Sequence, residues 1–467
     1  MPPLATALSR LIHAVFALFL QLAGTERNNS VASSSKNYTI NGFSALSNER
    51  TIELLGETFN HELEYLWDAD STPEHKTTAR SSTEFLTPSK QLYNADYDEV
   101  NRTLLSMLAF KWVLANDYQS FTRCQPSAVV LKQESFNELR KLCLSQIKNP
   151  ENILPLLVAM VINDLGKSPR LAKAVQKATG KPMTEANHDE VIYLAAENGM
   201  IRCLQQLDET QIGDVLLGLK LGATLNIAQF AQAENVPGSL EGVKVLEGNK
   251  NAFNLKFLEV LFDVAGAAGN VDARCAKAMI EPVYRSYMMA YRVLLDVVEN
   301  RGSHRQNYDK LLIAHGEKLK QQGFRHLSVE NPSERALLRL IVMGRSTSNK
   351  KQADLFDAAF KRLSDWERQA LVDGLNVDGT DDGEAIIPYY MPAVISEGLK
   401  NTSDEPEGRI EALASVMRLL GRVYGGSKPR KGQLGVVKER NLRHVTDVIH
   451  SGAFKSDPRI LDQLYSI

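Results

Sequence analysis

The 467-residue sequence predicts an all-α fold. Apolar residues recur at helical spacing through most of the chain, and the segment 51–67 is typical, with Ile52, Leu55, Phe59 and Leu63 on one face. No segment shows the sustained alternation, bounded by hairpin turns, that antiparallel strands need. The chain also has no convincing repeat period, which argues against a solenoid. We therefore expect a single helical core with additional C-terminal helices.

The central element of this core is expected at 153–164, which is apolar nearly all round and therefore fits a buried helix. Pro155 lies in its first turn, where proline is tolerated, and Gly166 and Pro169 end it. The polar stretch 68–98 is expected to be a loop. The other expected helices are 104–118, 136–147, 190–198, 212–230, 255–268, 273–298, 310–322, 334–343, 351–363, 409–423 and 447–451.

The chain divides into four regions by composition. Residues 1–24 read as a signal peptide or an apolar N-terminal helix, 25–48 as a polar linker, 49–345 as the helical core and 346–467 as a C-terminal helical region. A signal peptide would direct the protein to the secretory pathway, and without one a cytoplasmic location is expected. Glycosylation sequons begin at Asn28, Asn37, Asn101 and Asn401.

The overall charge excludes one class of partner. The formal net charge is -2, so there is no global electrostatic attraction to nucleic acid. Apart from the short N-terminal apolar segment, no stretch reads as a membrane anchor. The four cysteines, Cys124, Cys143, Cys203 and Cys275, lie far apart and lack zinc-type spacing, which leaves buried thiols or one or two disulfides.

Three polar residues stand in apolar surroundings and are candidates for a site. Asp164 ends the buried helix, Asp263 interrupts the apolar run 258–266, and His188 begins the next helix after the Asp164 loop. A carboxylate at a helix C-terminus faces the negative end of the dipole, and an isolated buried charge costs several kcal/mol. Two such aspartates therefore predict a shared compensating ion. Two carboxylates and one imidazole suit Mn, Fe or Mg.

Each of these residues also has a purely structural interpretation. Asp164 could form an ion pair with Lys167 at the mouth of the loop. Asn187 and Glu190 form a variant capping box, which would place His188 in an ordinary first helical turn. Asp263 could face solvent on an amphipathic helix, although the small residues that follow it favour close packing.

The segment 161–167, Val-Ile-Asn-Asp-Leu-Gly-Lys, resembles the His-Asp-Ile-Gly-Lys signature of the HD-domain superfamily. Members of that superfamily are all-helical and mostly metal-dependent phosphohydrolases, with a branch of diiron oxygenases. The resemblance covers roughly residues 100–300 in motif order and spacing. It implies that Asp164 bridges metal ions, that His188 and Asp263 are further ligands, and that Lys167 contacts an anionic substrate.

The chain departs from the family pattern at several ligand positions. Asn163 stands where the histidine of the His-Asp pair is expected, and the expected helices 104–118 and 136–147 contain no upstream histidine. Asn226 and Gln229 stand where a further histidine would lie. Amide side chains are weak metal ligands, so the resemblance implies a degenerate metal site rather than a dinuclear one.

Two enzyme hypotheses and one alternative follow. In the first, one divalent ion on Asp164, His188 and Asp263 activates water to hydrolyse a phosphate ester, as in other single-metal sites. In the second, no metal is present, and His188 with Asp164 or Asp189 performs acid–base chemistry on a small organic molecule. The alternative is a non-catalytic helical protein, a pseudoenzyme, that binds a ligand or partner.

The substrate residues are common to both hypotheses. Lys167 would hold an anionic group of a small-molecule ligand. In the metal-free version Asn163, Asn226 and Gln229 would orient the substrate by hydrogen bonds.

Overall fold

A computed structural model describes residues 38–69, 86–147, 149–150, 152–184 and 186–464. These residues are mostly helical, which confirms the all-α prediction. The N-terminal segment 1–24 and the sequons at Asn28 and Asn37 lie outside them. Within the described part of the chain, no helix is long and apolar enough to cross a membrane.

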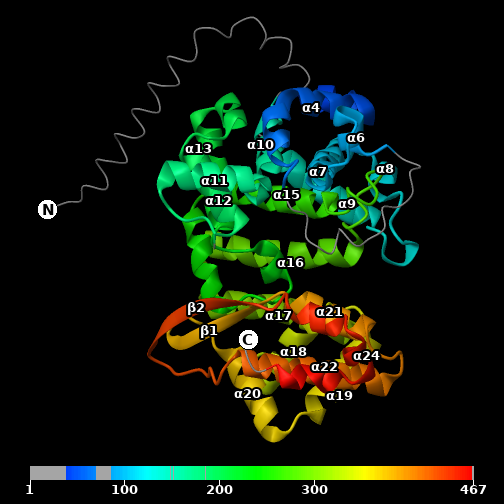
Figure 1. Cartoon of the computed structure of the whole chain (residues 1–467), viewed down its shortest axis with the longest axis vertical. Coiled ribbons are helices and arrows are strands. Elements are labelled where there is room, and N and C mark those ends of the chain that lie inside the picture. The colour runs from blue at the N-terminus through cyan, green and yellow to red at the C-terminus, as the bar shows by residue number, and fades with distance from the viewer. Residues whose placement is uncertain (1–37, 70–85, 148, 151, 185, 465–467) are drawn as a thin grey trace, which may run out of the picture.

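The first part of the chain folds into closely packed helices, which occupy the upper part of Figure 1. The helices are α3 (Ile40–Ala45), α4 (Asn48–Tyr65), α6 (Pro88–Tyr93), α7 (Asp98–Leu114), α8 (Tyr118–Thr122), α9 (Gln133–Gln146), α10 (Leu154–Ile162), α11 (Pro169–Thr179), α12 (His188–Glu197), α13 (Glu209–Gly222), α14 (Ile227–Ala231) and α15 (Lys250–Gly266). Short 3-10 helices join them at η2 (Ser127–Val129), η3 (Leu165–Lys167), η4 (Arg202–Gln206) and η5 (Pro237–Leu246).

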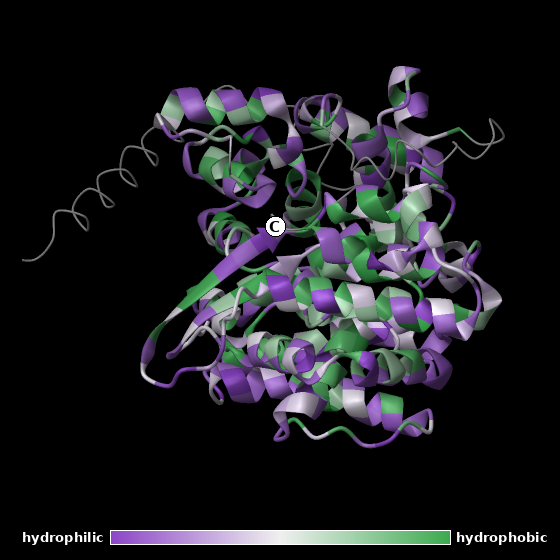
Figure 2. Ribbon diagram, turned by 60° about the horizontal axis from the view of Figure 1, so that its bottom comes forward, coloured by the Kyte–Doolittle hydropathy of each residue, from purple (hydrophilic) through white to green (hydrophobic). Residues whose placement is uncertain are grey.

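The second part begins with α16, which crosses the middle of Figure 1. Its helices are α16 (Glu281–Val298), α17 (His304–Gln321), α18 (Pro332–Met343), α19 (Lys350–Arg362), α20 (Asp365–Asn376), α21 (Met391–Lys400), α22 (Pro406–Val423), α23 (Val445–Ile449), α24 (Gly452–Ser456) and η6 (Pro458–Gln463). Here α22 packs against α19, α20 and α21. One hydrophobic cluster runs through both parts and across the expected boundary at 345/346. Figure 2 shows helices with both hydrophobic and hydrophilic residues, as expected when one face is buried.

Two strands correct the expectation of a chain without β-structure. β1 (Asp382–Tyr389) and β2 (Gln433–Asn441) pair in parallel, with Asp382 opposite Gln433 and an irregularity before Glu384. β1 is largely buried, whereas β2 is largely exposed. Neither strand alternates between buried and exposed residues over its whole length. The buried run in β1 is continuous, and β2 is exposed along most of its length. The alternation rule therefore could not detect them.

The expected helix at 212–230 is two helices. α13 ends at Gly222, and a new helix, α14, starts after Asn226, whose side-chain oxygen accepts a hydrogen bond from the Gln229 amide at 3.1 Å. The polar stretch 68–98 also contains the short helix α6, capped by Thr87.

The candidate site lies among α7, α10, α12 and α15. α7 packs along α15, and α10 contacts both, so three buried helices meet. α12 contacts η3, the turn that follows α10, and α12 also packs on α13. This arrangement brings the end of α10, the start of α12 and the middle of α15 to one place.

Candidate active site

Asp164 is buried at the end of α10 and is paired with a lysine from its own turn. The side chain of Asp164 is only 7% exposed, and its Oδ1 lies 2.8 Å from Nζ of Lys167. η3, which follows Asp164, places Lys167 three residues along the chain. The ion pair that sequence analysis gave as the structural interpretation of Asp164 is therefore present.

Lys167 also binds a second buried carboxylate, which the sequence analysis missed. Its Nζ lies 3.1 Å from Oε2 of Glu99, which is fully buried in the first turn of α7. Oε1 of Glu99 accepts a hydrogen bond from Nη1 of Arg102 at 2.8 Å. The sequence signal was an acid–base pair three residues apart at the start of an apolar helix, but the helix was expected to begin at residue 104.

Glu99 and Asp164 have pKa values that are pushed in opposite directions. Burial, with the negative charge of Asp164 beside it, raises the pKa of Glu99 to about 7, although Arg102 and Lys167 lower it. Burial alone would also raise the pKa of Asp164, but Lys167, Arg102 and His188 together hold it well below its usual range. Near pH 7 the pair therefore consists of a fixed carboxylate and a carboxyl group that exchanges its proton.

α15 adds Asp263 and a second ion pair. Burial and the charge of Asp164 raise the pKa of Asp263, which places these two aspartates within electrostatic range of each other. On the same helix, Nζ of Lys256 lies 2.6 Å from Oε2 of Glu259 and donates to Oδ1 of Asn163 at 3.3 Å. Burial raises the pKa of Glu259 to about 8, and its Oε1 has no hydrogen-bond partner.

His188 and Asp189 form the more exposed side of the site. The Asn187 half of the expected capping box is confirmed, since Oδ1 of Asn187 accepts a hydrogen bond from the Glu190 amide at 2.8 Å. Nε2 of His188 lies 3.6 Å from Oδ2 of Asp189, and the two side chains are 38% and 16% exposed. The cap at Asn187 and the Asp164–Lys167 ion pair are thus both present, and the charged side chains still lie close to one another.

Gly166 explains how His188 comes so close to the end of α10. A Cβ atom at Gly166 would lie only 1.8 Å from the backbone oxygen of His188, so only glycine permits this packing. The glycine that was expected to end the helix therefore also fixes the approach of α12 to Asp164.

The amide residues fall into two groups. Asn163 belongs to the cluster through Lys256, as described above. Asn226 caps α14, and Gln229 is buried and donates from Nε2 to Oε2 of Glu439 in β2 at 3.4 Å. Asn226 and Gln229 therefore contact residues other than those that surround Asp164.

The metal hypothesis requires a set of ligands around Asp164, His188 and Asp263. Among the residues that the structure describes, no three His, Cys, Asp or Glu side chains are grouped so that they could hold a metal ion. Lys167 instead places an ammonium group against Asp164 and Glu99. This ammonium group would compete with a divalent ion for the same carboxylates, and the metal site stays a prediction.

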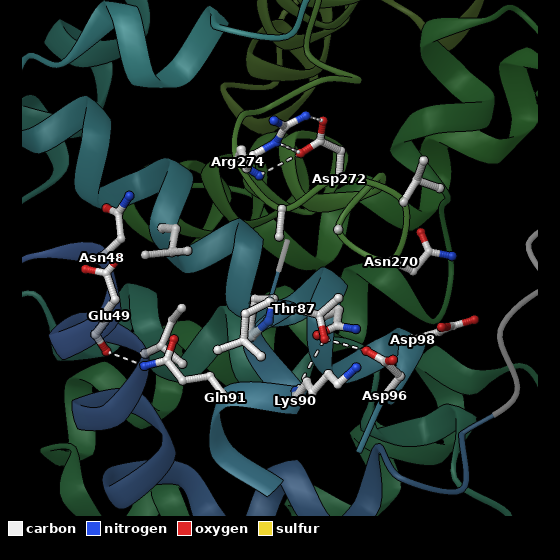
Figure 3. Close-up of a pocket in the computed structure, with 18 of the residues that line it drawn as sticks. Asn48, Glu49, Thr87, Lys90, Gln91, Asp96, Asp98, Asn270, Asp272 and Arg274 are labelled. Atoms are coloured by element: carbon white, nitrogen blue, oxygen red, sulfur yellow. Dashed lines mark hydrogen bonds and ion pairs between the residues drawn. The ribbon is translucent and has the colours of Figure 1, made fainter. Parts of the chain in front are cut away.

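A separate cavity of about 580 Å³ lies on another flank of α7. Figure 3 shows its polar lining, with Asn48 and Glu49 of α4 facing Asp96 and Asp98, and the Asp272–Arg274 pair on a third side. Its lining does not include Glu99, Asp164 or Lys167. Its lining residues are Asn48, Glu49, Ile52, Leu86, Thr87, Pro88, Lys90, Gln91, Asp96, Asp98, Asn101, Leu108, Arg123, Gly269, Asn270, Val271, Asp272, Ala273 and Arg274.

Fold and site together define an all-α protein with a buried cluster of ion pairs at the junction of its central helices. Comparison with known families assigns it further: the chain belongs to DUF6829, a family of unknown function, whose sequence profile matches residues 52–461. No curated protein and no solved structure shows significant similarity to the chain.

Proposed function

We propose that this protein is an enzyme on an HD-like helical scaffold that performs metal-independent acid–base chemistry on a small polar molecule. The observation that carries the proposal is the Glu99–Asp164 pair. Two neighbouring carboxyl groups whose surroundings separate their pKa values are the usual source of an acid and a fixed charge in one site. A group with a pKa of about 7 can both donate and accept a proton at neutral pH.

The roles follow from the contacts. Glu99 donates and recovers the proton, and Asp164 supplies a permanent negative charge that stabilises a developing positive charge. Lys167 holds both carboxyl groups with two short contacts. His188 and Asp189, on the more exposed side, exchange protons with water or act as the second acid–base group. Lys167 and His188 mark the side from which substrate enters, because they are the more exposed members.

The placement of the motif residues supports the HD-like scaffold. Asp164, Lys167 and His188 come together at the junction of α10 and α12, and Asp263 of α15 lies within electrostatic range of Asp164. On the upstream helix, where the resemblance requires a histidine, α7 supplies the acidic Glu99 instead. We interpret this as a site in which ion pairs have replaced metal ligands.

The non-catalytic alternative rests on the same ion pairs. Arg102, Lys167 and Lys256 compensate the buried carboxylates from within the chain, so the cluster could serve stability alone. In a purely structural cluster Glu99→Gln would lower stability without affecting any turnover, whereas in a catalytic one it would slow turnover.

The test is a turnover screen of the purified protein. A panel of phosphomonoesters, hydroxy acids and keto acids is incubated with the wild type, Glu99→Gln and Asp164→Asn, each with and without EDTA, and followed by mass spectrometry. The control is Glu57→Gln, which changes an exposed carboxylate of α4. We expect a compound that the wild type and the control convert in EDTA, and that both site variants convert at least ~100-fold more slowly.

The EDTA arm separates the two enzyme hypotheses. Turnover that EDTA abolishes and added Mn²⁺ restores would replace the metal-free mechanism by the single-metal one. Conversion that Glu99→Gln leaves unchanged would contradict the role of Glu99.

A further inference from the structure

Two cysteines that are distant in sequence meet in the fold. Cys124 follows α8, and Cys275 lies in the loop between α15 and α16. The side chain of Cys124 lies near enough to that of Cys275 to affect its ionisation, and neither cysteine is in a disulfide. The other two cysteines, Cys143 and Cys203, are buried elsewhere in the core. The sequence had left open whether any of the four could pair.

The main chain holds the two cysteines next to each other. The Ala276 amide, directly after Cys275, donates to the Phe121 carbonyl at 3.0 Å. Gln125, directly after Cys124, is buried and donates from Nε2 to the carbonyls of Ala276 at 2.7 Å and Met279 at 3.1 Å. These bonds hold the segment after α8 against the 275–279 loop. The backbone therefore keeps Cys124 and Cys275 close together.

The two thiols differ in access and in surroundings. Cys275 is fully buried, whereas Cys124 is half-buried and is the sulfur that a dissolved oxidant meets first. The carboxylate of Asp272, which lies beside Cys124, accepts hydrogen bonds from Nε and Nη2 of Arg274, each at 2.8 Å. Burial, reinforced by Cys124, raises the pKa of Cys275. Arg274 and Asp272 also line the cavity of Figure 3.

We propose that Cys124 and Cys275 are a redox-active pair that hydrogen peroxide converts to a disulfide at the edge of this cavity. The sulfur of Cys124 attacks one peroxide oxygen, the O–O bond breaks, and Cys124 becomes a sulfenic acid with release of water. The sulfur of Cys275 then attacks the Cys124 sulfur, the S–O bond breaks, and a second water leaves. The two thiols lose two electrons and two protons, and peroxide is reduced to two waters.

The disulfide would fix the 272–275 segment against the end of α8. Asp272 and Arg274, which lie within that segment, would then be held at the cavity wall. The oxidation state of the two cysteines would thus affect the shape of this cavity, which Glu99, Asp164 and Lys167 do not line.

Tryptic mapping of the full chain tests the proposal. Cleavage after Arg123 and Arg274 releases Cys124 in peptide 124–132 and Cys275 in peptide 275–277. Reduced protein is treated with stoichiometric hydrogen peroxide under native conditions, free thiols are alkylated, and the digest is analysed by mass spectrometry. We expect a linked 124–132/275–277 species, about 2 Da lighter than the sum of the reduced peptides, which dithiothreitol removes.

Two variants test which cysteines form the disulfide. Cys143→Ser should keep the linked species, and Cys124→Ser should lose it. If the wild type gives no linked species, whether Cys124 stays reduced or is oxidised without Cys275, the proposal is overturned. This decision needs only the wild type, so a folding defect in a variant does not affect it.

Discussion

Replacing Lys167 by methionine removes the cation that two buried carboxyl groups share. Nζ of Lys167 lies 2.8 Å from Asp164 and 3.1 Å from Glu99, whose side chains are 7% and 0% exposed. The Lys167 side chain is itself 19% exposed, so solvent screens these contacts little. Loss of one partner of a buried ion pair costs roughly 3–5 kcal/mol. Because Arg102 still pairs with Glu99, we expect the lower end, about 3 kcal/mol.

Urea unfolding followed by circular dichroism measures this loss. Lys177→Met is the matched control, because Lys177 is exposed on α11. The loss in Lys167→Met should be larger at about pH 8 than at about pH 5, since protonation of Glu99 removes one of the two negative charges that Lys167 compensates. A variant no less stable than the control at either pH would refute the claim that Lys167 compensates the cluster.

Three further predictions concern stability and modification. The pKa of Glu99 is raised from 4.5 to about 7, so the folded state binds more protons, and the free energy of unfolding falls as pH rises through that window. Glu99→Gln should remove up to about 3 kcal/mol of this fall, measured by urea titrations across the window. Gly166→Ala should cost about 1–3 kcal/mol in thermal unfolding because of the clash with His188, whereas Gly213→Ala, with no atom near its Cβ, should be neutral or stabilising. After expression in a secretory eukaryotic host, peptide mapping should find no glycan at Asn101, which is 1% exposed and accepts a hydrogen bond from the Ser89 amide.

Helices whose apolar faces are set by local sequence were predictable. The buried helix around Pro155 and the cap at Asn187 appear as expected, because both depend on residues within one or two turns. α7 was expected six residues too late, since its first turn is polar and only distant partners make that turn suitable for burial.

The site was predictable in part for the same reason. Asp164 was detected because a charge at the end of an apolar run is visible locally, and His188 because it begins the helix that follows the Asp164 loop. Glu99 was missed because its partner Lys167 lies 68 residues away, and no local pattern signals such a contact. The sequence left two sources of compensation open for Asp164, a bound ion or Lys167. The structure has the Lys167 ion pair, and Arg102 adds a cation that the sequence did not indicate.

The central claim, that Glu99 and Asp164 are an acid and a fixed carboxylate, is tested most directly by carbon-13 NMR of labelled carboxyl groups. The signals are assigned by their loss in Glu99→Gln and Asp164→Asn and followed through a pH titration. We predict that Glu99 titrates at about pH 7 and that the Asp164 carboxylate stays ionised at pH values well below its usual pKa. Titration of both groups near their ordinary values of 4.5 and 3.8 would contradict the account.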